Sequence, residues 1–153
     1  MITIENLILM LIMCCPRHEL NRDAELRAEV AGYFEAAGEK YEIPPRLMVV
    51  WFEGEASLRI DRVGKLGEVG LPQVHGIVRR SCEDAGYDPT TWRGGIYCGA
   101  LAMADSVAFC GSLERGLNRY ASGKCKGTPK SRALVKRRMR KWRKYARENQ
   151  KTF

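Results

Sequence analysis

A glutamate, two glycines and a glutamine follow one another in the middle of the chain. Glu55 ends an apolar segment, and Gly67, Gly70 and Gln73 follow it by twelve, fifteen and eighteen residues. A carboxylate that loses solvation is disfavoured in its charged form, and a carboxyl that keeps its proton near neutral pH can act as a general acid. The glycines permit strained backbone conformations or a close approach to the backbone. The spacing therefore predicts acid chemistry centred on Glu55.

Other titratable side chains near this stretch are weaker candidates. Glu53 lies two residues before Glu55 and would point away from it on a helix. His75, Glu68 and Asp61 could each supply a second catalytic group, but no motif places any of them. A glutamate at a helix end is most often a solvated charge, so the interpretation of Glu55 depends on the residues that follow it at fixed spacing.

The pattern resembles the soluble lytic transglycosylase family, which has a lysozyme-like fold. The family motif is an apolar helix ending in Glu-Ser, a short loop, Gly-x-x-Gly-Leu-Met-Gln and, further on, a Tyr-Asn-x-Gly turn. The resemblance covers about half of the chain, and the matching residues are Glu55, Gly67, Gly70, Leu71, Gln73, Tyr120 and Gly123. The sequence departs from the motif at three positions, where Ala56, Pro72 and Ala121 replace Ser, Met and Asn.

This resemblance implies cleavage of the peptidoglycan glycan strand between N-acetylmuramic acid and N-acetylglucosamine. Glu55 would protonate the glycosidic oxygen and then act as base on the muramoyl C6 hydroxyl, which closes a 1,6-anhydro ring. Gly70, Leu71, Gln73 and Tyr120 would bind the sugar. Because the nucleophile is tethered to the substrate, a second carboxylate is not required, and neither a cofactor nor a metal is expected.

Two alternatives remain open at this point. Lysozyme-type hydrolysis of the same bond (muramidase activity) would use two carboxylates. A non-catalytic wall-binding module on the same fold is the other alternative, and the departures at Ala56, Pro72 and Ala121 motivate it.

Length and composition predict a mainly α, lysozyme-like single domain with a basic C-terminal helix. The chain has 153 residues, which suits one domain. We expect an apolar segment over 1–20, the transglycosylase domain over 21–128 and a basic amphipathic helix over 129–153. Helical periodicity and stop signals predict helices over Arg22–Lys40, Pro45–Glu55, His75–Ala85, Ser112–Gly123 and Lys130–Asn149. Small and apolar residues at close spacing occupy Gly94–Ala104.

Positive charge is concentrated at the C-terminus. Thirteen Lys and Arg and one Glu lie between Lys124 and Phe153, a net charge of +12, whereas the other residues carry 13 basic and 17 acidic side chains, a net charge of −4. Such an end suits an anionic wall polymer or anionic lipid. Nucleic acid, with stacking on Trp142 and Tyr145, is the least favoured partner, and a monomer is expected.

The N-terminal segment and the cysteines bear on location. Met1–Cys15 is apolar but too short to span a bilayer, so it is either an export or anchoring segment or a helix packed on the domain. Four cysteines lie in the body, at Cys82, Cys98, Cys110 and Cys125, which in an exported protein predicts two disulfides. Three connectivities are possible, and we favour Cys110 with Cys125. We expect an extracytoplasmic or phage-associated protein.

Overall fold

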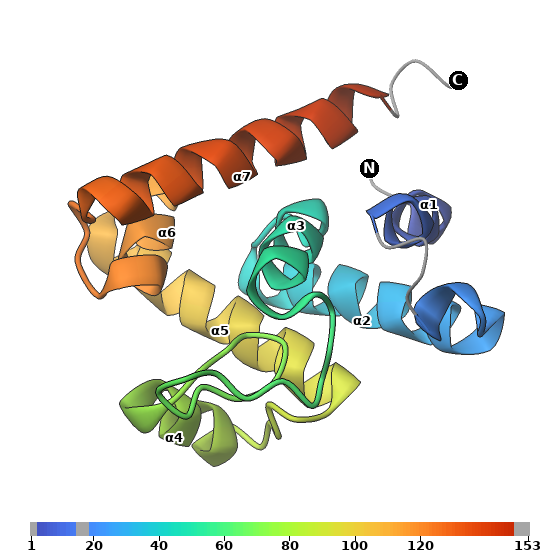
Figure 1. Cartoon of the computed structure of the whole chain (residues 1–153), viewed down its shortest axis with the longest axis horizontal. Coiled ribbons are helices and arrows are strands. Elements are labelled where there is room, and N and C mark those ends of the chain that lie inside the picture. The colour runs from blue at the N-terminus through green and yellow to red at the C-terminus, as the bar shows by residue number, and fades with distance from the viewer. Residues whose placement is uncertain (1–2, 15–18, 149–153) are drawn as a thin grey trace.

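The computed structural model describes residues 3–14 and 19–148 and is mainly helical, with 72% helix. Within these ranges the chain forms seven α-helices and one short 3-10 turn (Figure 1). The elements are α1 (Ile4–Cys14), η1 (Glu19–Asn21), α2 (Ala24–Tyr41), α3 (Pro45–Ala56), α4 (Gly76–Asp84), α5 (Trp92–Cys110), α6 (Leu113–Ser122) and α7 (Pro129–Glu148).

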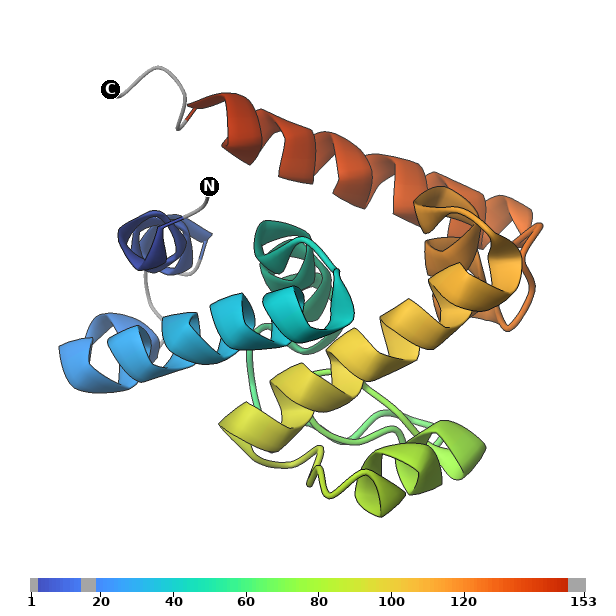
Figure 2. The ribbon, with the colours of Figure 1, turned by 180° about the vertical axis from the view of Figure 1, so that it is seen from behind.

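Helix α3 forms the centre of the molecule. Every residue from Arg46 to Phe52 is buried, as expected for a helix that is apolar on most sides. It contacts α1, α2, α5 and α7, and Figures 1 and 2 show these helices arranged around it. The residue that ends α3 is therefore held on a rigid and well-packed element.

Local signals explain most helix boundaries. Asp23 caps α2 by accepting a hydrogen bond from Leu26 N, and Thr91 caps α5 in the same way through Gly94 N. Side-chain oxygens at this position satisfy backbone N–H groups that have no partner within the helix. Pro45 occupies the first position of α3, where proline costs nothing.

Helix α2 ends one residue beyond its predicted end at Lys40. Gly38 lies inside α2, and the helix ends at Tyr41, followed by Glu42 in the left-handed conformation. A Cβ at Gly38 would lie 2.6 Å from Pro45 Cγ and 2.7 Å from Ile43 O. The glycine therefore permits the close packing of the next turn against α2, and it is not a stop signal.

The segment between α3 and α4 is a loop, as expected for Arg59–Lys65. Two isolated antiparallel bridges, Val63 with Val69 and Val69 with Val74, hold it together. Figure 1 places this loop and α4 below the end of α3, against α5. Helix α5 is longer than its predicted stretch, because the residues on both sides of Gly94–Ala104 continue the helix.

The two ends of the described chain pack on the domain. Leu7, Met10 and Leu11 of α1 are buried, as are Val135 and Met139 of α7, so each helix docks on the core through an apolar face. Our expectations for Cys15 and for the end of the last helix at Asn149 fall outside the described residues.

Among the described residues no single helix is both long and apolar enough to cross a membrane; α5 and α6 together pass that test, but as a pair bent by 117°.

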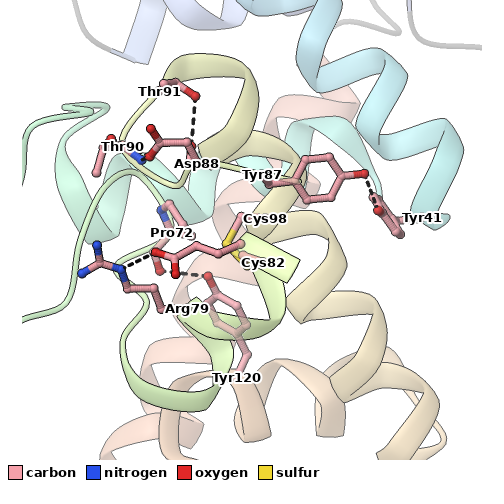
Figure 3. Close-up of a disulfide and its surroundings, with 11 residues drawn as sticks. Tyr41, Pro72, Arg79, Cys82, Tyr87, Asp88, Thr90, Thr91, Cys98 and Tyr120 are labelled. Atoms are coloured by element: carbon pink, nitrogen blue, oxygen red, sulfur yellow. Dashed lines mark hydrogen bonds and ion pairs between the residues drawn. A yellow bond between two sulfur atoms is a disulfide. The ribbon is translucent and has the colours of Figure 1, made fainter. Parts of the chain in front are cut away.

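Two disulfides link the helices around α5. Cys110 pairs with Cys125, which confirms the favoured pairing, and Cys82 pairs with Cys98 (Figure 3). The second bond joins α4 to α5, and the first joins the end of α5 to the segment that follows α6.

Candidate functional site

Glu55 lies in the last turn of α3 and forms an ion pair with a residue of the last helix. Arg138 Nη1 donates to Glu55 Oε1 at 2.6 Å. The Arg138 side chain is only 9% exposed, and that of Glu55 is 26% exposed. The sequence analysis did not anticipate this cation, which comes from a residue 83 positions further along the chain.

The surroundings of Arg138 are shaped for its guanidinium. The group lies 4.6 Å from the centre of the Trp51 ring, a cation–π geometry. A Cβ on Gly54 would lie 2.7 Å from Arg138 Nη2, so the glycine allows the guanidinium to approach the helix backbone. The three residues Trp51, Gly54 and Glu55 thus form one cradle for a side chain that arrives from α7.

Glu53, the rival carboxylate, also faces α7 but in a more open position. Lys141 Nζ lies 3.3 Å from Glu53 Oε2, and both side chains are more exposed than those of the Glu55–Arg138 pair. Exposed pairs of this kind contribute little to stability. The two glutamates therefore differ in environment, and only Glu55 is held against a buried cation.

Tyr120 connects this cluster to the turn after the glycines. Its hydroxyl donates to Pro72 O at 2.9 Å (Figure 3), and its ring packs edge-on against Trp51 with centroids 6.2 Å apart. Burial raises the pKa of Tyr120 well above its usual range, and the charge of Glu55 adds to the rise while Arg138 opposes it. The hydroxyl therefore stays protonated at every physiological pH and remains a donor.

The glycines and Gln73 shape a tight turn. Gly67 and Gly70 have positive φ angles of 84° and 72°, and Gln73 has φ of 49°. A Cβ on Gly70 would overlap Pro89 O. Gly70 therefore serves both a positive φ and a close approach of another backbone segment. Gln73 Nε2 donates to Gly70 O at 2.8 Å and to Arg62 O at 3.1 Å. The amide thus uses its N–H groups to hold the loop.

Leu71 cannot contact a ligand on the surface, because it is fully buried beside Gly95. The structure places Leu71 in a packing role beneath the turn, where it does not reach a sugar on the surface. Gly70 likewise supports the turn from within, since its carbonyl accepts the Gln73 amide. Of the four residues expected to bind sugar, only Gln73 and Tyr120 line a cavity.

That cavity is an open groove of about 510 Å³ beside the turn, a size that suits a small ligand. One wall is the 72–78 segment with the start of α4, and the other is formed by α5 and α6. Polar groups project from His75, Ser81, Asp105, Ser106 and Arg119. Glu55 does not line the groove. Tyr120 lines it, and the charge of Glu55 acts on the Tyr120 hydroxyl.

The other titratable candidates are engaged elsewhere. Glu68 accepts a hydrogen bond from Leu66 N, and backbone N–H groups lower its pKa. Asp61 pairs with the exposed Arg59. His75 lies before α4, at the rim of the groove. Across residues 3–14 and 19–148, no three His, Cys, Asp or Glu side chains lie close enough to hold a metal ion.

Sequence reasoning missed Arg138, although a signal was present. Position 138 falls three residues after Val135 and four before Trp142, so it lies on the inward face of the last helix. Ten of the 20 residues of α7 are Lys or Arg, and a buried arginine cannot be recognised among so many by composition. A basic residue on the apolar face of a docking helix was the feature that distinguished it.

Comparisons of the chain with protein-family models, with curated proteins and with solved structures found no match. The interpretation of the site therefore rests on its own geometry.

Proposed function

We propose that the chain is a peptidoglycan lytic transglycosylase on a lysozyme-like domain, with Glu55 as its single acid and base. The observation that carries the proposal is the position of Glu55. It lies in the last turn of a helix whose residues from Arg46 to Phe52 are buried, and its charge acts on Tyr120, which lines the groove together with Gln73. A half-buried carboxyl whose charge reaches a residue of such a groove is a candidate general acid.

The proposed reaction moves two protons through one carboxyl. Glu55 gives its proton to the glycosidic oxygen as the bond from that oxygen to the muramoyl C1 breaks. The resulting carboxylate takes the proton of the C6 hydroxyl, whose oxygen then bonds to C1 and closes the anhydro ring. The first step requires Glu55 to carry a proton when the glycan is bound, although Arg138 lies against its carboxyl.

The test compares two variants with the same chemical change. Glu55→Gln removes the acid, while Glu53→Gln removes the neighbouring carboxylate that pairs with Lys141. We expect Glu55→Gln to lower the rate of glycan release from purified walls at least about 100-fold, and Glu53→Gln to retain most of it. Both variants should keep the helical circular dichroism of the parent. Retained activity in Glu55→Gln would overturn the assignment.

Mass spectrometry of the released muropeptides separates the two enzymatic outcomes. Anhydro ends are lighter by one water than reducing ends, so their mass identifies transglycosylation. Reducing ends alone would instead assign lysozyme-type hydrolysis, and would require a second catalytic group besides Glu55.

A non-catalytic wall-binding module is the second candidate, and one observation favours it. The Glu55 carboxyl is engaged by Arg138 and does not line the groove. Wall sacculi that retain the protein in a pull-down, without any release of soluble glycan, would support this alternative.

The two disulfides support a location outside the cytoplasm. Cys82–Cys98 and Cys110–Cys125 are typical of proteins that fold in oxidising compartments. We propose an extracytoplasmic or phage-associated protein that acts on the glycan strands as a monomer.

A further inference from the structure

The outer face of α1 is apolar although it faces solvent. Its described residues are apolar except for Thr3, which precedes it, and for Glu5 and Asn6 within it. Leu7, Met10 and Leu11 point into the core, while Leu9 and Met13 on the opposite side are 50% and 60% exposed. A helix that docks on a domain normally turns a polar face outward. The exposed apolar side of α1 is therefore a surface that needs a covering.

The outer face of α7 is strongly basic and has little compensation. Its exposed cations recur at helical spacing, at Lys136, Arg137, Arg140, Arg143, Lys144 and Arg147. The carboxylates of α3 are occupied by the inward-facing Arg138 and Lys141. Within the described part of the helix the only acidic residue is Glu148, which lies 3.9 Å from Lys144.

The two faces belong to one end of the molecule. Leu7, Met10 and Leu11 of α1 share a single core cluster with Met139 and Trp142 of α7. In Figures 1 and 2, α1 and the C-terminal half of α7 both lie at the end of the molecule away from α4. A partner that contacts both helices must therefore be broad and must lie at this end of the molecule.

We propose that α1 and the outer face of α7 form a docking surface for an anionic lipid bilayer. A bilayer offers both complements at once, because its headgroups attract the cations and its interface accepts the apolar side chains. An anionic polymer would neutralise α7 but would leave the apolar face of α1 in water. Stable association with a membrane surface generally requires two such signals together.

The test measures co-sedimentation of the full chain with vesicles in about 0.1 M NaCl, where screening is substantial. One set of vesicles is phosphatidylcholine alone, and the other contains roughly 30% phosphatidylglycerol. We expect binding to the anionic vesicles to be at least about tenfold tighter, and to weaken as salt is added. Absence of binding to the anionic vesicles, or equal binding to both, would overturn the proposal.

Two variants separate the two faces, and a third controls for net charge. The first variant reverses the charge of the basic face by changing Lys136, Arg140 and Arg147 to Glu. The second removes the apolar face by changing Leu9 and Met13 to Ser. The control changes three exposed cations elsewhere, Lys65, Arg80 and Arg115, to Glu. We expect the first two variants to lose at least about tenfold in vesicle affinity and the control to stay within about twofold.

A soluble polyanion, polyglycerol phosphate, distinguishes the polymer from the bilayer. If the Leu9 and Met13→Ser variant binds vesicles as well as the parent does, or if the parent binds the polymer as tightly as the anionic vesicles, the surface serves a polyanion and the proposal falls. Circular dichroism melts of every variant confirm that each remains folded during the measurement.

Discussion

At the scale of single residues, Glu55 is joined to a cation from a distant part of the chain. Arg138 lies 2.6 Å from its carboxylate. The pKa of Tyr120 responds to both charges, because Glu55 raises it and Arg138 lowers it.

Replacement of Arg138 tests the contribution of this pair. Arg138→Gln leaves Glu55 half-buried without its cation, so we expect a loss of about 1–3 kcal/mol in the free energy of unfolding. Urea unfolding of the variant and of the parent measures this loss.

Lys141→Gln is the matched control, since it removes the cation from the more exposed Glu53 pair. We expect a change below about 0.5 kcal/mol in the free energy of unfolding. Equal behaviour of the two variants would show that the burial of Arg138 has no consequence for Glu55.

Tyr120→Phe removes the hydroxyl that holds the Pro72 carbonyl. We expect the free energy of unfolding to fall by about 1 kcal/mol. Tyr33→Phe should lower it by almost nothing, because the Tyr33 hydroxyl contacts the exposed Glu29. Because burial raises the pKa of Tyr120, its contribution is complete below the ordinary tyrosine pKa of about 10. It is lost as pH rises from there towards the folded value.

Absorbance at the tyrosinate band provides the measurement. In the folded parent, Tyr120 should stay protonated when exposed tyrosines ionise, whereas in denaturant all six tyrosines should titrate together. A folded Tyr120→Phe protein with a smaller tyrosinate signal near pH 10 than the parent would contradict the assignment.

At the scale of elements, the sequence predicted which segments are helical better than it predicted where each helix begins and ends. The helices that begin at Pro45, Leu113 and Pro129 follow apolar periodicity and start signals, so their existence and starts were predictable. The packing role of Gly38 was not predictable, because a glycine that permits close packing and a glycine near a helix end look alike in sequence. Helix α5 was underestimated because its flanks carry no strong periodicity.

The turn at Gly70 allows a matched test of backbone and packing effects. Gly70→Ala combines a positive φ with an overlap against Pro89, whereas Gly67 has a positive φ in open space. We expect a loss of about 1 kcal/mol for Gly67→Ala and at least about 2–3 kcal/mol for Gly70→Ala.

Urea unfolding of the two variants checks this difference. Equal losses would mean that the contact with Pro89 is not maintained in solution. The glycan-release assay adds a second readout, because displacement of the Gly70 turn should also disturb Gln73, which donates to the Gly70 carbonyl.

At the scale of the whole molecule, one core unites six of the helices and leaves α4 attached by a smaller one. The main cluster draws on α1, α2, α3, α5, α6 and α7. A separate cluster contains Val74, Cys82, Tyr87 and Cys98, and Ile77 and Val78 of α4 remain exposed. Sequence showed that the cysteines would pair, but the division of the core depends on long-range packing that composition does not encode.

This division predicts a local effect for one disulfide. The double variant Cys82→Ser, Cys98→Ser should lower the free energy of unfolding by about 3 kcal/mol, from the entropy of the opened loop. It should also accelerate amide exchange in α4 while the rest of the core stays protected. Hydrogen-exchange mass spectrometry resolves the two regions.

The matched control is Cys110→Ser with Cys125→Ser, which opens a loop of similar length around α6. Since α6 belongs to the main cluster through Leu117, its exchange should change less than that of α4 does in the first variant. Uniform acceleration across the whole chain in the first variant would contradict the separate attachment of α4.

The pairing of Glu55 with Arg138 spans 83 positions of the chain, and this has a consequence for biosynthesis. The ribosome completes α3 well before it reaches α7, so a nascent chain carries the carboxylate and the cradle of Trp51 and Gly54 with no guanidinium to fill it. Contacts of such long separation form late, after the cost of closing the loop has been met. A nascent chain therefore carries the Glu55 side of the pair before its partner exists, and the charge pair forms only after α7 has been made.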